Sequence, residues 1–220
     1  MLATLTTRRL STLSAGLIAF TAAAAFASTS NPDKPFDAVA IVDRAQGEIS
    51  LERDGTVREL KRGQEISRRD TLRTGATSRL SVHFNDGSKL IMGENALVVV
   101  ADYMAEEGRR SGALILDLIR GAIRLVAEQP KQAPNKRIEV RTAAATLTTK
   151  GVDLWSGPVD GQFAILVMRG QVGVRNEAGL VTLEGKRRGT VVSHRDQAPE
   201  KPVVWARERT NQSLMTVAFK

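Results

Sequence analysis

The feature that most constrains the fold of this chain is an alternation of apolar and polar side chains with a period of two residues. It is clearest in residues 79–92, RLSVHFNDGSKLIM, where every second residue from Leu80 to Phe84 is apolar. Asn85-Asp86-Gly87 follows, and these residue types tolerate the positive φ that tight hairpin turns require. The pattern therefore predicts a β-hairpin with one buried face and one face in water.

The same alternation recurs on both sides of this hairpin. Residues 39–57 contain further strands around an Asp54-Gly55 turn, and residues 138–192 contain several more. Turn signals recur at intervals of roughly eight to twelve residues, and no helical crossovers separate the strands. The sequence predicts an all-β fold: a sandwich or β-roll of many short, mainly antiparallel strands with glycine turns.

One long apolar run, Ala113 to Val126, fits two structures. Its LILDLI segment is compatible with a buried helix as well as with strands. We expect strands, because β-branched residues and flanking glycines favour them and because Gly121 suits a bulge or a bend. A helix is the alternative.

The first residues carry an export signal. Arg8 and Arg9 form a positive n-region, residues 10–26 are uncharged, and Ala25-Phe26-Ala27 matches a small-residue cleavage site. We expect a signal peptide at residues 1–27 that is cleaved, and a mature protein in the periplasm or secreted. An uncleaved anchor is the alternative, and the paired arginines leave the twin-arginine route open. No other stretch approaches the about 20 apolar residues of a membrane helix, so no membrane span is expected after cleavage.

The rest of the chain divides into three parts by pattern. Residues 28–37 contain prolines and predict a linker, whereas residues 38–195 hold the alternating strands and predict one all-β domain. Residues 196–220 lose the alternation and predict a C-terminal tail, either docked or with a short helix near Pro202.

Composition narrows the function. The absence of cysteine excludes disulfide, thiol redox and thiolate–metal chemistry. The net charge is +8, but the basic pairs lie in predicted turns among acidic residues and have few aromatic neighbours. We therefore expect a solvated surface and no nucleic-acid partner, with attraction to anionic envelope polymers or lipid head groups as the alternative.

No catalytic or metal-binding pattern stands out. The two histidines, His83 and His194, lack the spacing of metal ligands, and no metal or cofactor is expected. Ser193, His194 and Asp196 lie close together on one predicted strand, where neighbouring side chains point to opposite faces. We therefore expect no catalytic triad and no catalytic residue.

Five residues are candidates for contact with a ligand or partner. Asp153 and Trp155 share one face of a predicted strand, and an aromatic ring beside a polar group suits sugar binding. With a second carboxylate, Asp153 would also suit glycoside hydrolysis. Packing of Trp155 in the core or at an edge is the alternative. The basic turn of Lys186, Arg187 and Arg188 supplies further candidates.

The order of the motifs resembles the FecR domain of bacterial envelope regulators. AQGEISLERDG and LKRGQEISRRDTLRTG are similar to the early strand pair, the Gly-Asp-type turn and the Thr-Gly pair of that family. Asp86-Gly87-Ser88 is similar to its aspartate-glycine-serine hairpin. The segment from Arg120 to Arg124 and that from Val167 to Val174 resemble later strands of the family. The resemblance extends over roughly residues 38–192.

One segment departs from the family pattern. The family's Thr-Pro-x-Ala…Arg-Gly-Thr segment falls on RTAAATLTTKGV, where Ala143 stands in place of the proline and Lys150-Gly151-Val152 in place of Arg-Gly-Thr. The chain thus resembles a divergent member.

The resemblance implies a function in binding. The best-known members join a cytoplasmic anti-sigma region and a membrane helix to this domain, which faces a TonB-dependent receptor. Only nine residues precede the apolar run here. The resemblance therefore implies a stand-alone exported, non-enzymatic binding, scaffolding or sensory module that contacts another cell-envelope protein. A carbohydrate- or peptidoglycan-binding module is the alternative, and an enzyme acting on envelope glycans through Asp153 is a third hypothesis.

Overall fold

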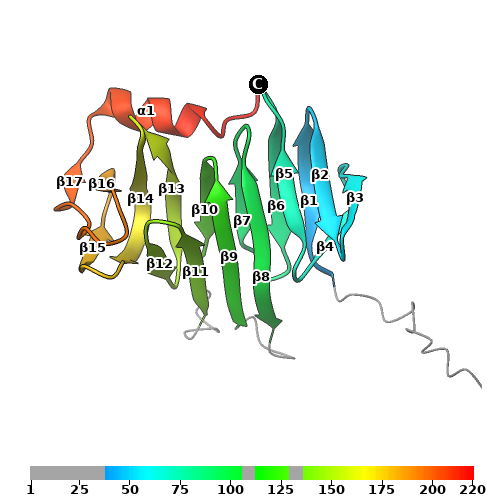
Figure 1. Cartoon of the computed structure of the whole chain (residues 1–220), viewed down its shortest axis with the longest axis horizontal. Helices are drawn as coiled ribbons and strands as arrows, with labels where there is room; N and C mark the ends of the chain where they lie inside the picture. The colour runs from blue at the N-terminus through cyan, green and yellow to red at the C-terminus, as the bar shows by residue number, and fades with distance from the viewer. Residues whose placement is uncertain (1–37, 106–111, 129–135) are drawn as a thin grey trace, which may run out of the picture. The chain divides into compact units, whose positions relative to one another are not determined.

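The computed structural model describes residues 38–105, 112–128 and 136–220 (Figure 1). Within these ranges the chain forms 17 strands and one helix, which confirms the predicted all-β class. Residues 1–37, with the predicted signal peptide and linker, lie outside the described residues. In the described ranges, no helix has the length and apolarity needed to cross a membrane. In chain order the elements are β1 (Ala38–Gln46), β2 (Ile49–Arg53), β3 (Thr56–Glu59), β4 (Glu65–Ser67), β5 (Thr71–Thr74), β6 (Arg79–Phe84), β7 (Lys89–Met92), β8 (Leu97–Ala105), β9 (Gly112–Arg120), β10 (Ile123–Ala127), β11 (Arg137–Thr142), β12 (Thr146–Thr149), β13 (Val152–Val159), β14 (Gln162–Arg175), β15 (Leu180–Glu184), β16 (Arg188–Val192), β17 (Val203–Val204) and α1 (Arg207–Met215).

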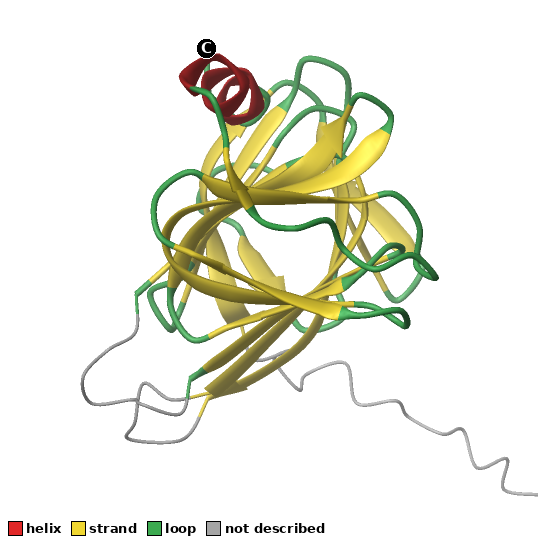
Figure 2. Ribbon diagram, turned by 90° about the vertical axis from the view of Figure 1, so that its left-hand side faces the viewer, coloured by secondary structure: helices red, strands yellow, loops and turns green. Residues whose placement is uncertain are grey.

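The strands form two layers, which we call sheet A and sheet B (Figure 2). The order in sheet A is β4–β1–β6–β7–β10–β13–β14–β16–β17. The order in sheet B is β3–β2–β5–β8–β9–β11–β12–β14–β15. Among the described strands only β9 and β11 pair in parallel, so the prediction of mainly antiparallel strands is confirmed.

The chain crosses repeatedly between the layers, and β14 belongs to both. Residues 163–167 of β14 pair with β16 in sheet A, whereas residues 171–175 pair with β15 in sheet B. The strand bends between them at Gly170, whose φ of +87° is a left-handed value that suits glycine. An added Cβ there would lie 2.4 Å from the carbonyl oxygen of Gly151. One strand therefore joins the two sheets through a residue that has no room for a side chain.

The apolar run from Ala113 to Val126 forms strands and not the alternative helix. It contributes most of β9 and β10, and Gly121 lies between them with a φ of +86°. An added Cβ on Gly121 would lie 2.5 Å from the Cα of Ala96, so this turn packs closely on the segment that connects β7 to β8. The turn carries the chain from β9 in sheet B to β10 in sheet A.

The main hydrophobic core lies between the sheets. On β6, Leu80, Val82 and Phe84 are fully buried. On the face predicted to be in water His83 is exposed, but Arg79 and Ser81 are buried. Removing one such apolar side chain from water contributes on the order of 1.5–3 kcal/mol. The alternation in the sequence thus places one face of β6 in the core.

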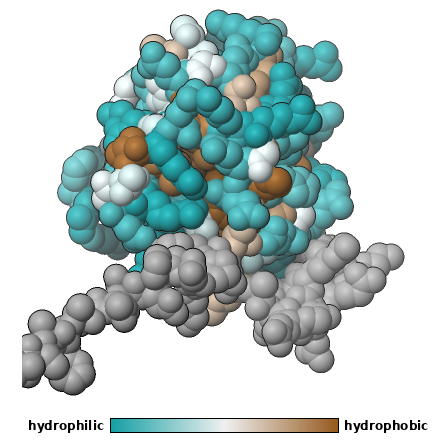
Figure 3. All heavy atoms as spheres, turned by 90° about the vertical axis from the view of Figure 1, so that its right-hand side faces the viewer, coloured by the Kyte–Doolittle hydropathy of each residue, from teal (hydrophilic) through white to brown (hydrophobic). Residues whose placement is uncertain are grey.

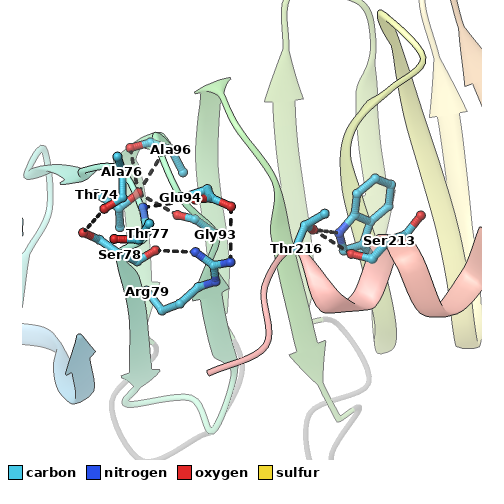
Figure 4. Close-up of polar contacts among 11 residues, drawn as sticks. Thr74, Ala76, Thr77, Ser78, Arg79, Gly93, Glu94, Ala96, Ser213 and Thr216 are labelled. Carbon is cyan, nitrogen blue, oxygen red and sulfur yellow. Dashed lines mark hydrogen bonds and ion pairs between the residues drawn. The ribbon is translucent and has the colours of Figure 1, made fainter. Parts of the chain in front are cut away.

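Polar contacts connect the β5–β6 and β7–β8 crossings (Figure 4). The Thr74 hydroxyl donates to the carbonyl oxygen of Gly93 at 2.6 Å and accepts from the amide of Ala96 at 2.8 Å. Arg79, which is buried, lies 3.5 Å from the carboxylate of Glu94. These contacts supply partners for backbone groups at points where the chain leaves one sheet for the other.

A second apolar cluster lies on the outer face of sheet A, beneath residues 203–220, which we call the C-terminal arm. The rings of Trp155 on β13 and Trp205 on the arm meet edge to face, with centroids 6.4 Å apart. Trp155 Nε1 donates to the hydroxyl of Thr216 at 2.9 Å, and that hydroxyl donates to the carbonyl oxygen of Ser213 (Figure 4). The buried members of the cluster are Ala122, Trp155, Ala164, Leu166, Val191, Trp205 and Val217.

The arm contains the secondary structure of the C-terminal segment, residues 196–220. β17 extends sheet A by pairing with β16, and α1 begins at Arg207, beyond Pro202. The helix lies outside both layers (Figures 1 and 2). The last residues reach β1, where the guanidinium of Arg44 lies 4.1 Å from the centre of the Phe219 ring.

A charged triad lies on β11, on the outer face of sheet B. The carboxylate of Glu139 accepts hydrogen bonds from Arg141 at 2.7 Å and from Arg137 at 2.6 Å. The bond from Arg141 is the main cause that lowers the pKa of Glu139 below its ordinary value of 4.5, and burial of the carboxylate opposes it.

Glu139→Gln is expected to remove a stabilising contribution that exists only while the carboxylate is ionised. The pKa is lowered in the folded state, so this contribution is present above the unfolded pKa and is lost as the pH falls through the lower folded value. Urea unfolding should show the variant to be less stable than the wild type near pH 6, with the gap closing at about pH 3. A gap that does not change between these pH values would contradict the role of the ionised carboxylate.

Candidate functional site

An apolar pocket of about 330 Å³ lies at one end of the sandwich. It forms where the end of β9, the β11–β12 turn and the β13–β14 hairpin meet. Its volume is near the lower limit of the roughly 300–1,000 Å³ typical of ligand pockets. The lining residues are Leu118, Ile119, Arg120, Gly121, Thr142, Ala143, Ala144, Pro158, Gly161, Gln162 and Phe163.

The β11–β12 turn is held by the side chain of Thr142. Its hydroxyl accepts from the amides of Ala144 at 3.2 Å and Ala145 at 3.0 Å, and it donates to the carbonyl oxygen of Ala145 at 2.8 Å. These bonds close a tight local turn of the kind that threonine favours. The turn places Ala143, which is exposed, in the wall of the pocket.

The rim of the pocket combines fixed polar groups with one exposed apolar side chain. Arg120 Nε donates to the carbonyl oxygen of Asn95 at 3.1 Å, and Gln162 Nε2 donates to the hydroxyl of Ser193 at 2.7 Å. Ile119 is 56% exposed beside them. An apolar recess with few polar groups suits the insertion of an apolar side chain better than it suits a polar small molecule.

A second groove, of about 450 Å³, lies along β2, β3 and β5 and has a different character. Its lining alternates between acidic residues, Glu48 and Glu59, and basic residues, Arg58 and Arg73. The end of the molecule that carries β2, β3 and β4 is mainly hydrophilic, with apolar residues in small separate groups (Figure 3). Opposite charges side by side give this groove no clear preference for a ligand of either sign.

The structure places Asp153 and Trp155 in structural contacts. Asp153 accepts two hydrogen bonds from Arg124 on β10, at 2.8 Å each. Bonding to Asp153 is the main cause that raises the pKa of Arg124. Trp155 is fully buried beneath the C-terminal arm. A platform for sugar binding needs an exposed aromatic ring face. The arm covers the ring of Trp155, which the sequence offered as a candidate for this contact.

The basic turn between β15 and β16 contacts the C-terminal arm. Lys186 is exposed. The guanidinium of Arg187 donates from Nη1 to the carbonyl oxygen of Trp205 at 3.2 Å, and the carbonyl oxygen of Arg187 accepts from the amide of Trp205 at 2.8 Å. Arg188 is paired with Val204 across β16 and β17. Two of these three candidate residues therefore lie beside the arm.

The residues that could suggest a catalytic triad are only partly connected. His194 Nδ1 bonds the carboxylate of Asp196, but the hydroxyl of Ser193 accepts from Gln162 and has no hydrogen bond to His194 among those found in the described residues. In the part of the chain that the structure describes, no group of three His, Asp or Glu side chains is arranged to hold a metal ion.

Sequence reasoning missed the apolar pocket. Its lining residues from Leu118 to Gly121 and from Thr142 to Ala144 lie in segments that the sequence singles out, but no local pattern reports that three turns meet there. The pocket was detectable only as an unusual feature of the family-like segment, where alanine replaces proline.

Comparison with known proteins agrees with the resemblance seen in the sequence. The model of the FecR protein family matches residues 70–173. The matched range includes every residue that lines the apolar pocket and ends before the C-terminal arm. Among curated proteins, no sequence matches the chain.

Solved structures share the fold. Two crystal structures of a candidate anti-sigma factor from Parabacteroides distasonis, at 2.50 Å and 1.65 Å resolution, superpose with TM-scores of 0.52 and 0.51. Their sequences are 15% and 14% identical to this one, and each match covers 66% of this chain. This chain spans 63% and 64% of the length of theirs. The family match confirms the resemblance to FecR domains over residues 70–173, and the solved structures share the fold.

Proposed function

We propose that this protein is an exported, non-enzymatic FecR module that binds another cell-envelope protein and serves in signalling. The FecR match and the fold shared with a candidate anti-sigma factor support a regulatory module. The signal peptide predicted at residues 1–27 supports a location in the periplasm or outside the cell. The pairing of Asp153 with Arg124 and the bond of Ser193 to Gln162 rather than to His194 support binding rather than catalysis.

The observation that carries this proposal is the apolar pocket inside the FecR-matched segment. Its walls are set by a closed threonine turn and a hairpin, so it is formed before any partner arrives. A buried apolar anchor in such a recess is the usual centre of a protein interface. The exposed Ile119 beside it adds apolar area to the same surface. The partner is therefore a protein that presents an apolar side chain to this end of the domain.

Crosslinking in living cells tests the contact directly. A photoreactive amino acid at Ile119 is expected to give a covalent adduct with one envelope protein, recovered in the periplasmic or membrane fraction. The matched control is Val57, which is 64% exposed on β3, away from the pocket-lining elements. Equal adducts from both positions, or none from Ile119, would contradict the proposal.

Ala143→Trp is expected to block the contact without unfolding the domain. Ala143 is exposed, so the larger side chain reaches the pocket from its wall and costs little folding energy. We expect at least a fivefold loss of the Ile119 adduct, on the order of 1 kcal/mol of binding. Ala178→Trp, at an exposed alanine in the β14–β15 turn, is the control and should leave the adduct unchanged.

A further inference from the structure

We propose that the C-terminal arm is a displaceable cover over an apolar docking face of sheet A. This inference rests on the proposed function and adds a second surface to the binding site. The docking face consists of the outward side chains of β13, β14 and β16. Its buried members are Trp155, Ala164, Leu166 and Val191, with Val159 and Met168 partly buried beside them.

The docking face is apolar in its own right. Trp155 pairs with Leu166 across β13 and β14, and Ala164 pairs with Val191 across β14 and β16. The neighbours of these residues on each strand, such as Leu154 and Ile165, face the main core between the sheets. Both faces of this part of sheet A are therefore apolar. An antiparallel sheet that faces water on one side alternates instead, so a face of this kind requires a cover.

The docking face continues into the apolar pocket. Ala122, a member of the covered cluster, follows the pocket residue Gly121. Pro158, which lines the pocket, follows Gly157, and an added Cβ on Gly157 would lie 2.7 Å from the Cβ of Ala122. Displacing the arm would thus expose one surface that extends from the pocket across β13 to β16.

The arm is built from weakly held pieces. β17 has two residues, and α1 has nine, fewer than an isolated helix needs to be stable in water. No side chain caps the start of α1 at Ala206. The fully buried residues of α1 are polar, Thr210 and Ser213, whereas its Leu214 is only partly buried against the cluster and its Met215 is 65% exposed.

Buried polar atoms without partners lie within the arm. Six buried side-chain polar atoms lack a hydrogen bond among the described residues, and three of them belong to the arm. Such atoms have lost water without gaining a partner, so each opposes docking and favours release. The three atoms are Trp205 Nε1, Arg209 Nε and Thr210 Oγ1.

Two apolar anchors hold the arm in place, and they define what can replace it. The indole of Trp205 lies over Gly189, where an added Cβ would lie 2.4 Å from Nε1. The second anchor, Val217, packs in the same cluster. The replacing segment is therefore part of the envelope partner: an extended stretch that pairs with β16 and places an indole over Gly189.

A peptide with the sequence of residues 201–220 tests this inference as a probe. The full-length wild type should bind the labelled peptide weakly, because its own arm occupies the face. Trp205→Ala should release the arm and bind the peptide at least tenfold more tightly. Val203→Ala, at an exposed residue of β17 just before Trp205, is the matched control and should behave as the wild type.

Two further variants show whether the peptide occupies the arm's own site. A peptide with alanine at the position of Trp205 should not bind. Adding Gly189→Ala to Trp205→Ala should abolish peptide binding, because the new methyl group fills the place of the indole. Binding that survives either change would overturn the assignment of the site.

Hydrogen exchange on the wild type gives an independent measurement should Trp205→Ala fail to fold. The amide of Trp205, bonded to Arg187, should exchange faster than core amides of β6, because the arm opens locally. Equal exchange rates would overturn the proposal. Equal peptide affinity in wild type and Trp205→Ala, or arm-exchanged dimers of the wild type in sedimentation, would overturn it as well.

The experiments distinguish a failure of the displaceable cover from a failure of the proposed function. Tight peptide binding by Trp205→Ala without any adduct at Ile119 would support the cover and contradict the envelope partner. An adduct at Ile119 with no gain in peptide binding would support the partner and contradict the cover. If both proposals hold, Trp205→Ala should increase the yield of the Ile119 adduct.

Discussion

Gly170→Ala is expected to destabilise the domain by on the order of 4 kcal/mol. Two costs add at this position. The φ of +87° is unfavourable for alanine by about 1–2 kcal/mol. The new Cβ would also lie 2.4 Å from the carbonyl oxygen of Gly151 and 3.2 Å from the Cα of Val152, both backbone atoms of the paired segment. Relief requires β14 to part from β13.

Thermal unfolding measures this cost against a matched control. Gly161→Ala introduces the same methyl group at a similar φ of +77°, but nothing lies within 4 Å of its Cβ. We expect a loss of about 1 kcal/mol at Gly161 and a fall in Tm of roughly 8–16 °C at Gly170. Equal losses would show that the backbone angle alone matters and that the crossing of β14 between the sheets is not tightly packed.

Asp86→Asn is expected to cost about 3–5 kcal/mol, because it leaves a buried lysine without its counter-ion. Lys136 is 1% exposed, and its Nζ lies 3.0 Å from Asp86 Oδ2 and 2.9 Å from the hydroxyl of Ser88. The asparagine keeps the size of the side chain but removes the charge. The ammonium group of Lys136 then stays buried, and the groups that surround it at this site are all neutral.

The chain offers both a control and a rescue for this prediction. Asp54 precedes a glycine in the β2–β3 hairpin as Asp86 does in the β6–β7 hairpin, but Asp54 is exposed. Asp54→Asn should therefore change stability by less than about 0.5 kcal/mol. Adding Lys136→Met to Asp86→Asn should recover most of the loss, since an apolar side chain needs no counter-ion. Urea unfolding of the wild type and these three variants measures the loss and its rescue, and a double variant as unstable as Asp86→Asn would refute the ion-pair explanation.

The hairpins and the all-β class could be predicted because they depend on residues close together in sequence. On β6 the alternation of Leu80, Val82 and Phe84 fixed the buried face, and Asn85-Asp86-Gly87 fixed the turn. The partners across the sheets could not be predicted in this way. Gly170 has the sequence signature of a turn between strands, yet it is a bend within β14, because the strand pairs with different neighbours on its two sides.

The candidate site was harder to predict than the fold for the same reason. Trp155 lies on the outer face of its strand, where local periodicity predicts contact with water, but an arm that follows it by about 50 residues covers it. Asp153 is paired with Arg124 only because β10 and β13 are neighbours in sheet A. The apolar pocket depends on three turns between residues 118 and 163 that the sheet order brings together.

The sequence by itself determined the strand class, the hairpin turns and the resemblance to FecR domains, because backbone preference and the two-residue period act over a few neighbouring residues. It also predicts the signal peptide and export, which stay predictions. Only the tertiary structure decided that β14 joins two sheets, that Trp155 is covered and that a pocket forms at one end of the sandwich. These features depend on contacts between distant segments, whose energies come from packing that no local pattern specifies.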